Sequence, residues 1–445
     1  MVDYDREITG QLDVIERCSI STDGRRALLA GLPNSRYPYV YPRDVWAAVR
    51  LFSEVALSDL SSSERAFTLL REVAAFIAFV QREDGHWGQR YEVSGEDKSI
   101  YRQEDNVAHG GAALATYLLT ANALGREVPD WDELLERVLR GAQYALKNYY
   151  RPEIHLFYST TSVHESAMEK GYSLWVNFAY LQLLYLMAEL DKVNGHKEEM
   201  DKILRNRDSF RQNLFRIFDY DQRFVRRLTP DGAADFRPDI TLLSPFYFRW
   251  GREEYSEGSR MVKNHYPNTV EFLESSLWSP EFGLLQRYLP FNEDMSVHAH
   301  AGNGPWFQYT AILAQYYYFM GNRDRGDEIL RLMDQYRSED DYLPEHISSC
   351  ERFWEFIRTE WETGNDARKE FGPEILLPNL PYDLIVEELV NMKKSYDGIR
   401  GYCTLQEGGS PFIRFSSPLM WAHAEYAMAL LVRRKAGYPA VISIP

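Results

Sequence analysis

Apolar residues recur every three to four positions along most of the chain, and this spacing predicts helices with a buried face. About ten clear helices follow from the pattern, at 45–57, 61–80, 106–123, 131–149, 172–193, 197–218, 269–276, 305–320, 323–336 and 419–435. Two more are predicted at 239–249 and 383–396. Alternating apolar and polar residues, which indicate half-buried strands, are nearly absent. We therefore expect an all-α protein.

The predicted helices come in consecutive pairs, and long loops rich in glycine, aspartate and aromatic residues separate the pairs. These loops cover 82–104, 151–171, 222–238, 278–304 and 343–381. Ordered loops of this length in a compact domain usually carry function. A ring of paired helices, with the loops gathered at one end as a cleft, fits this rhythm, and so does a two-lobed helical protein. Because no low-complexity linker interrupts the chain, we expect residues 1–445 to form a single domain.

The composition and charge of the chain limit which partners and which cellular location we expect. The 445 residues carry a net charge of −16, which argues against nucleic acid, since phosphate contacts need clustered Lys and Arg. No run of apolar residues is long enough for a membrane span, and the charged N-terminus lacks the apolar core of a signal peptide. The expected location is cytoplasmic. Cys18, Cys350 and Cys403 show neither a disulfide framework nor zinc spacing, so we expect buried, unpaired thiols.

Two glutamates in the long loops are candidates for chemistry. Glu165 lies just before a helix start, and Glu345 lies between a proline and a histidine in the opening of the longest loop. A glycosidic bond is usually cleaved by two carboxyl groups, one a protonated acid for the leaving oxygen and the other an anion that acts as base or nucleophile. Glu165 and Glu345 could form this pair. The plain alternative for each is an exposed, solvated glutamate.

Arg43 and Asp44 follow three tyrosines that alternate along the chain, Tyr37, Tyr39 and Tyr41. Prolines between them keep the backbone extended, which predicts that the three rings lie on one side together with Arg43. A guanidinium supplies a planar fork of donors and a carboxylate supplies acceptors, so the two together suit the vicinal hydroxyls of a sugar ring. The alternative is that Asp44 caps the helix that follows.

Further candidates lie next to predicted helices. Gln103 and Asp105 precede the helix at 106–123, and Asp105 is also placed to cap it. Trp421 and His423 are two residues apart on the last helix, so their side chains point in different directions. One of the two is expected to face a pocket while the other packs in the core.

Arg287, Tyr288 and Trp306 stand on either side of an insertion, 293–303. This insertion contains His298 and His300, and His-x-His can bind a metal. No third ligand has a convincing spacing, so we expect loop histidines that face solvent, with no metal and no cofactor.

In their order along the chain these segments resemble glycoside hydrolase family 15, the glucoamylases and their relatives. The resemblance runs from about residue 36 to residue 431. It implies an (α/α)6 barrel, in which six helical hairpins form a double ring with long loops around a pocket at one end, and it implies an inverting mechanism.

The resemblance also implies roles. Glu165 matches the general acid of the family, with His164 and Ser166 in place of a neighbouring tryptophan and a second glutamate. Glu345 matches the general base. Tyr41 stands where the family has a tryptophan before the Arg–Asp pair that binds the terminal glucose. The residues implied to bind substrate are Tyr37, Tyr41, Arg43, Asp44, Gln103, Asp105, His164, Arg287, Tyr288, Trp306 and Trp421.

The resemblance therefore predicts an exo-acting, inverting α-glucosidase. An N-terminal β-sandwich and a starch-binding domain are not expected, which favours a small oligosaccharide. The altered acid motif favours α-1,6 linkages slightly over α-1,4 linkages, with trehalose third. One alternative is a catalytically inactive barrel that binds sugar or regulates a partner. Another is a different helical-barrel enzyme, such as a phosphorylase or a hydrolase of uronic acid oligosaccharides.

Overall fold

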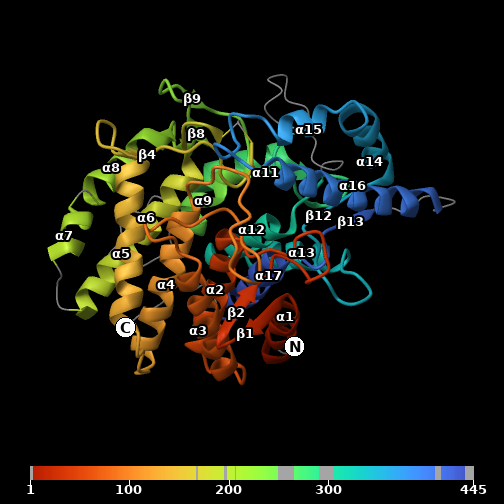
Figure 1. Cartoon of the computed structure of the whole chain (residues 1–445). Coiled ribbons are helices and arrows are strands. Elements are labelled where there is room, and N and C mark those ends of the chain that lie inside the picture. Colours follow the sequence, from red (N-terminus) through yellow and green to blue (C-terminus); the bar gives the residue numbers. More distant parts are fainter. Residues whose placement is uncertain are drawn as a thin grey trace.

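The computed structural model describes residues 4–166, 169–194, 198–205, 207–248, 265–289, 304–405 and 412–435, and these are mainly helical (Figure 1). Six helical segments form an inner ring, and each contacts the next until the ring closes. The inner segments are α2 (Pro42–Ala56), α4 (Asn106–Ala123), α6 (Leu174–Asn194), the 3-10 turn η2 (Ile240–Leu243) continued by α9 (Ser244–Tyr247), α12 (Phe307–Phe319) and α17 (Met420–Arg434).

A second set of helices packs on the outside, each against an inner neighbour. The outer helices are α1 (Tyr4–Arg17), α3 (Ser63–Phe79), α5 (Trp131–Asn148), the pair α7 (Glu198–Leu204) and α8 (Arg207–Phe218), α11 (Tyr266–Leu277) and α13 (Arg323–Asp334). The double ring is an (α/α)6 barrel, so the predicted fold is confirmed and the two-lobed alternative is wrong.

The two rings differ in how polar residues are distributed. In the inner helix α4 every residue from Asn106 to Ala121 is buried, as expected for a helix surrounded by protein. The outer helix α5 buries one stripe that includes Leu134, Val138 and Leu139, while its charged residues face water. The sequence periodicity therefore detects the outer helices by their stripe and the inner helices by continuous apolar runs.

Short antiparallel strands connect the helices, and they are more numerous than the sequence suggested. They are β1 (Ser19–Thr22) with β2 (Arg25–Leu28), β3 (Tyr150–Arg151) with β4 (Leu156–Phe157), β6 (Asp219–Tyr220) with β7 (Arg223–Phe224), β10 (Trp278–Ser279) with β11 (Leu284–Leu285), β12 (His346–Ser348) with β13 (Ile413–Phe415), and the sheet β5 (Tyr172–Ser173), β8 (Arg227–Leu228), β9 (Ala234–Asp235).

The segment between β12 and β13 is a helical cap, and its first part was predicted to be loop. It contains α14 (Cys350–Phe356), a π-helical turn (Ile357–Trp361), α15 (Asn365–Glu370) and α16 (Tyr382–Leu405). These helices lie together at one side of the barrel, next to β12 and β13 (Figure 1). They have a small apolar core of their own that includes Phe353, Phe356, Met392 and Tyr396.

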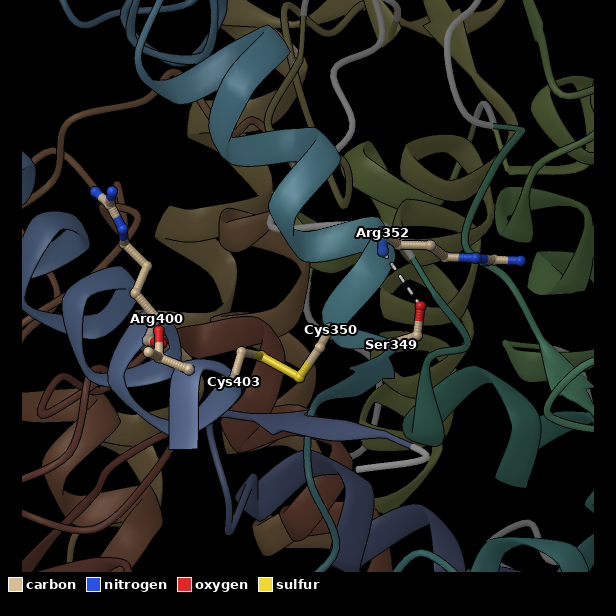
Figure 2. Close-up of a disulfide and its surroundings, with 6 residues drawn as sticks. Ser349, Cys350, Arg352, Arg400 and Cys403 are labelled. Atoms are coloured by element: carbon tan, nitrogen blue, oxygen red, sulfur yellow. Dashed lines mark hydrogen bonds between the residues drawn. A yellow bond between two sulfur atoms is a disulfide. The ribbon is translucent and has the colours of Figure 1, made fainter. Parts of the chain in front are cut away.

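A disulfide joins Cys350, at the start of α14, to Cys403, near the end of α16 (Figure 2). The expectation of three unpaired thiols is therefore wrong, and only the buried Cys18 is free. The sequence could not indicate this pairing, because the two cysteines are separated by 53 positions and meet only when α14 and α16 fold together.

We expect the Cys403→Ser protein to be less stable than the native protein by about 2–4 kcal/mol, because the bond restricts the unfolded chain. Thermal unfolding under oxidising conditions measures the difference. Reductant should lower the unfolding temperature of the native protein and leave that of a Cys350→Ser/Cys403→Ser protein unchanged. Equal effects of reductant on both proteins would contradict the pairing.

Candidate active site

A pocket opens at the end of the barrel where the inner helices begin. Tyr41, Trp306 and Leu419 are the residues that directly precede α2, α12 and α17, and all three have extended backbones. The lining residues are Ala30, Tyr37, Tyr41, Arg43, Asp44, Val163, Glu165, Arg287, Trp306, Gln308, Tyr309, Glu345, Leu419 and Trp421.

Most of the residues predicted for a site are among these lining residues. Four of the predicted residues, Gln103, Asp105, His164 and Tyr288, instead lie behind the pocket wall, where they contact the lining residues Arg43 and Arg287. The sequence did not indicate Ala30, Val163, Gln308, Tyr309 and Leu419, which line the pocket as well.

The Arg43 guanidinium is hydrogen-bonded on the side that faces away from the pocket, by Asp105 and Gln103. Its Nε and Nη2 donate to the two carboxylate oxygens of Asp105 at 3.0 and 3.2 Å, and Nη2 also donates to Gln103 Oε1 at 2.9 Å. Burial alone would raise the pKa of Asp105, but the Arg43 guanidinium and the His109 side chain together hold this pKa well below its usual range. Nη1 donates to no residue that the structure describes, so this side of the fork is available to a ligand.

Asp44 lines the pocket without forming a hydrogen bond to any described residue. Burial raises its pKa to about 7, with Arg43 opposing the shift and Glu345 and Glu165 adding to it. The helix α2 begins at Pro42, with Tyr41 in the capping position. Asp44 is therefore not the cap, and its oxygens are available to a ligand.

Only two of the three alternating tyrosines line the pocket. Tyr37 and Tyr41 do so. Tyr39 donates its hydroxyl to Glu387 in α16 at 2.8 Å, and the Arg90 guanidinium lies 4.5 Å from its ring centre. The prediction that all three rings share one side is wrong for Tyr39, which instead ties the cap to the barrel.

The Glu165 carboxyl group is fixed on one oxygen and open on the other. Its Oε1 accepts hydrogen bonds from Gln103 Nε2 at 2.6 Å and from Gln89 Nε2 at 3.2 Å. Oε2 accepts none from the described residues. Burial raises the pKa of Glu165, with Arg43 opposing the shift. The group is therefore suited to carry a proton on Oε2, next to the pocket.

The chain before Glu165 is bound by Arg287. The Arg287 side chain donates from Nε to His164 Nδ1 at 2.9 Å and from Nη2 to the Val163 carbonyl. Burial lowers the pKa of His164 to about 4, so the imidazole is neutral and Nδ1 can accept. Its Nε2 lies 3.3 Å from Asp239 Oδ2. His164 thus positions Arg287 and does not itself line the pocket.

Glu345 is carried on a rigid support at the start of β12. The Tyr37 hydroxyl lies 3.3 Å from its Oε2 as a donor, and its backbone N–H donates to the Phe415 carbonyl at 3.0 Å. The next residue, His346, stacks between the rings of Trp306 and Phe415, at centroid distances of 4.8 and 4.2 Å. The side chain therefore has little freedom to leave the pocket.

Trp421 and His423 separate as expected from their spacing. Trp421 lines the pocket, and its Nε1 donates to Glu425 at 3.1 Å. His423 is buried, and its Nε2 accepts from the Leu343 backbone N–H at 2.9 Å. Because Leu343 is two residues before Glu345, this bond helps to fix the segment that carries the second carboxylate.

The part of the chain that the structure describes contains no group of three His, Cys, Asp or Glu side chains arranged to hold a metal. His298, His300 and the insertion 293–303 lie outside the described residues. No helix among the described residues is both long enough and apolar enough to cross a membrane.

Comparison with solved structures gives the fold a name. The chain aligns with a wild-type glycosidase at a TM-score of 0.60 and 14% identity, over 98% of this chain and 97% of that one. It aligns with the glucoamylase of Saccharomycopsis fibuligera at a TM-score of 0.61 and 14% identity, over 98% and 96%. The fold is that of the glucoamylases. A bacterial glucoamylase complexed with acarbose also matches, at a TM-score of 0.61 and 15% identity, over 98% of this chain and 56% of that one.

Comparison of the sequence itself finds no matching family model and no matching curated protein. At these identities the similarity to glucoamylases establishes the architecture alone.

Proposed function

We propose that the protein is an exo-acting, inverting α-glucosidase that releases glucose from the non-reducing end of small α-glucosides. The observation that carries the proposal is one pocket lined by two glutamates in different surroundings. Burial raises the pKa of Glu165, while Glu345 accepts from the Tyr37 hydroxyl. We assign the buried Glu165 as the acid and the hydrogen-bonded Glu345 as the base, because different surroundings suit two carboxyl groups to different roles.

In the proposed reaction the terminal sugar is held by Arg43 Nη1 and by the Asp44 oxygens, which form no bonds to described residues. Glu165 gives the proton on Oε2 to the glycosidic oxygen as the bond to C1 breaks. Glu345 takes a proton from a water, and the oxygen of that water forms the new bond to C1 from the opposite face. The products are glucose of inverted configuration and the free alcohol, and both carboxyl groups exchange protons with solvent before the next cycle.

Complexes of similar structures support sugar as the ligand class. A variant of the matching glycosidase was solved in complex with glucose, and the bacterial glucoamylase in complex with acarbose. The side of the pocket next to Glu165 differs from the family pattern, because His164 is turned toward Arg287. This difference supports a leaving group other than the 4-hydroxyl of glucose, and we favour α-1,6 linkages over α-1,4 linkages.

Glucose release from maltose, isomaltose, longer homologues of each, and trehalose tests the proposal. We expect release with the highest kcat/KM on isomaltose or its homologues, and the first product seen by proton NMR should be β-glucose. Release of α-glucose would contradict inversion. No release from any of these sugars would favour the inactive, sugar-binding alternative, which glucose binding without turnover would then support.

A further inference from the structure

A third glutamate, Glu169, is buried behind the segment that carries Glu165. Its side chain is 2% exposed. Its Oε2 accepts two backbone hydrogen bonds, from the N–H of Ser162 at 2.7 Å and from the N–H of His164 at 2.9 Å. The two donors are two residues apart, so one carboxyl oxygen holds two alternate peptide groups on the same side of the chain.

The opposite side of this segment is held by other groups. The Val163 carbonyl, between the two N–H groups, accepts from Arg287, and the Ser162 hydroxyl lies 3.1 Å from Asp105 Oδ2. With its backbone held on both sides, the segment directs the side chains of Val163 and Glu165 into the pocket.

Glu165 itself has a backbone conformation that needs such support. Its φ is +53°, in the left-handed region that residues other than glycine rarely adopt. Conformations of this kind persist only where the surroundings fix them. The two bonds from Ser162 and His164 to Glu169 end one residue before Glu165, so they bear directly on the direction of its side chain.

The surroundings of Glu169 favour its neutral form. It has no ion-pair partner among the described residues, and its Oε1 is buried there without a hydrogen-bond partner. Burial raises its pKa to about 8. The Ser162 N–H opposes this shift, but the carbonyl-like oxygen of a protonated carboxyl group can still accept from both donors that converge on Oε2.

We propose that Glu169, as a neutral carboxyl group, is a positioning residue that sets the place of the Glu165 carboxyl group at the leaving-group side of the pocket. The inference rests on the proposed role of Glu165 as general acid. A positioning role of this kind differs from a general structural role in its effect on the reaction. Loss of Glu169 should impair the protonation of the leaving group more than it impairs the attack of water.

Two substrates separate these steps. A disaccharide substrate needs protonation of the leaving oxygen, whereas α-glucosyl fluoride loses fluoride without it. We expect Glu169→Leu, which removes the acceptor at similar volume, to lower kcat on the disaccharide about 10-fold to 100-fold, since general acid catalysis contributes about 10²–10⁴-fold. Hydrolysis of the fluoride should fall by less than about 3-fold on the same reasoning. Glu169→Gln keeps a neutral acceptor and should restore most of the disaccharide activity.

Glu54 supplies a matched control. It is a buried glutamate near the far end of α2, paired with Lys435 at 2.6 Å, and any loss in Glu54→Leu should be equal for the two substrates. If Glu169→Leu does not fold, Glu169→Asp, which retracts the acceptor, should show the same selective loss. Equal losses on both substrates in the Glu169 variants, or a Glu169→Gln protein as impaired as Glu169→Leu, would overturn the inference.

The Glu165→Gln protein distinguishes failure of the positioning role of Glu169 from failure of the proposed function. If Glu165→Gln hydrolyses the disaccharide normally, the proposed function itself fails. If it loses the disaccharide and keeps the fluoride while the Glu169 variants lose both equally, only the positioning role of Glu169 fails.

Discussion

The Glu345→Gln protein should lose hydrolysis of every glucoside substrate, including α-glucosyl fluoride, by at least about 10²–10⁴-fold, the usual contribution of a general base. Both substrates need an activated water, and an amide cannot take its proton. Glutamine keeps the shape of the side chain and can still accept from the Tyr37 hydroxyl, so glucose binding should be largely retained. Initial rates and calorimetric binding of glucose measure the two effects.

Glu351→Gln is the matched control, because Glu351 is an exposed glutamate in α14, shortly after Glu345 in the chain. It should have native kinetics. Near-normal turnover of the Glu345→Gln protein would remove Glu345 as the base and with it the proposed reaction.

The Glu165→Gln protein should lose hydrolysis of disaccharides by about 10²–10⁴-fold and keep most of its activity on α-glucosyl fluoride. The physical reason is that glutamine has no proton to give, while fluoride needs none. The ratio of the two rates, compared between native and variant protein, is the measurement. A similar loss on both substrates would contradict the role of general acid.

The pH dependence gives a second check on Glu165. The acid acts in its protonated form, so native activity on a disaccharide should fall as pH rises through the pKa of Glu165, which burial raises. With α-glucosyl fluoride and the Glu165→Gln protein, this alkaline limb should vanish while the acidic limb remains. Asp44, whose pKa burial raises to about 7, acts with the opposite sign: it accepts from the sugar as a carboxylate, so its protonation should add to the acidic limb.

The helices of the barrel could be predicted from the sequence because buried apolar residues recur once per helical turn, every three to four positions. The predicted helix 106–123 coincides with α4, and 131–149 differs from α5 by one residue. The helices of the cap were harder to predict from the sequence. Because α14 and α15 have only seven and six residues, fewer than two turns each, their apolar residues show little periodicity. The single helix predicted at 197–218 is divided into α7 and α8.

Within the pocket, the sequence could indicate residues that belong to a recognisable motif, such as Arg43 and Asp44, but not residues that look like ordinary core. Gln308 and Tyr309 lie in the first turn of α12 and look like core in the sequence. The partner of Arg43 could not be predicted either. The guanidinium binds Asp105, 62 positions later, because α2 and α4 begin side by side in the inner ring.

The position of the cap in the chain has a consequence for how this protein can vary. Ser348 is paired with Ile413, so the 64 residues of 349–412 leave the barrel and return to it at one point. The length and composition of such an excursion can change without shifting Glu345 or α17, since the ribbon of β12 and β13 closes beneath it. The cap is in this sense an insertion with its own core, and its variation is limited mainly where it is tied back to the barrel, as by the hydrogen bond from Tyr39 to Glu387.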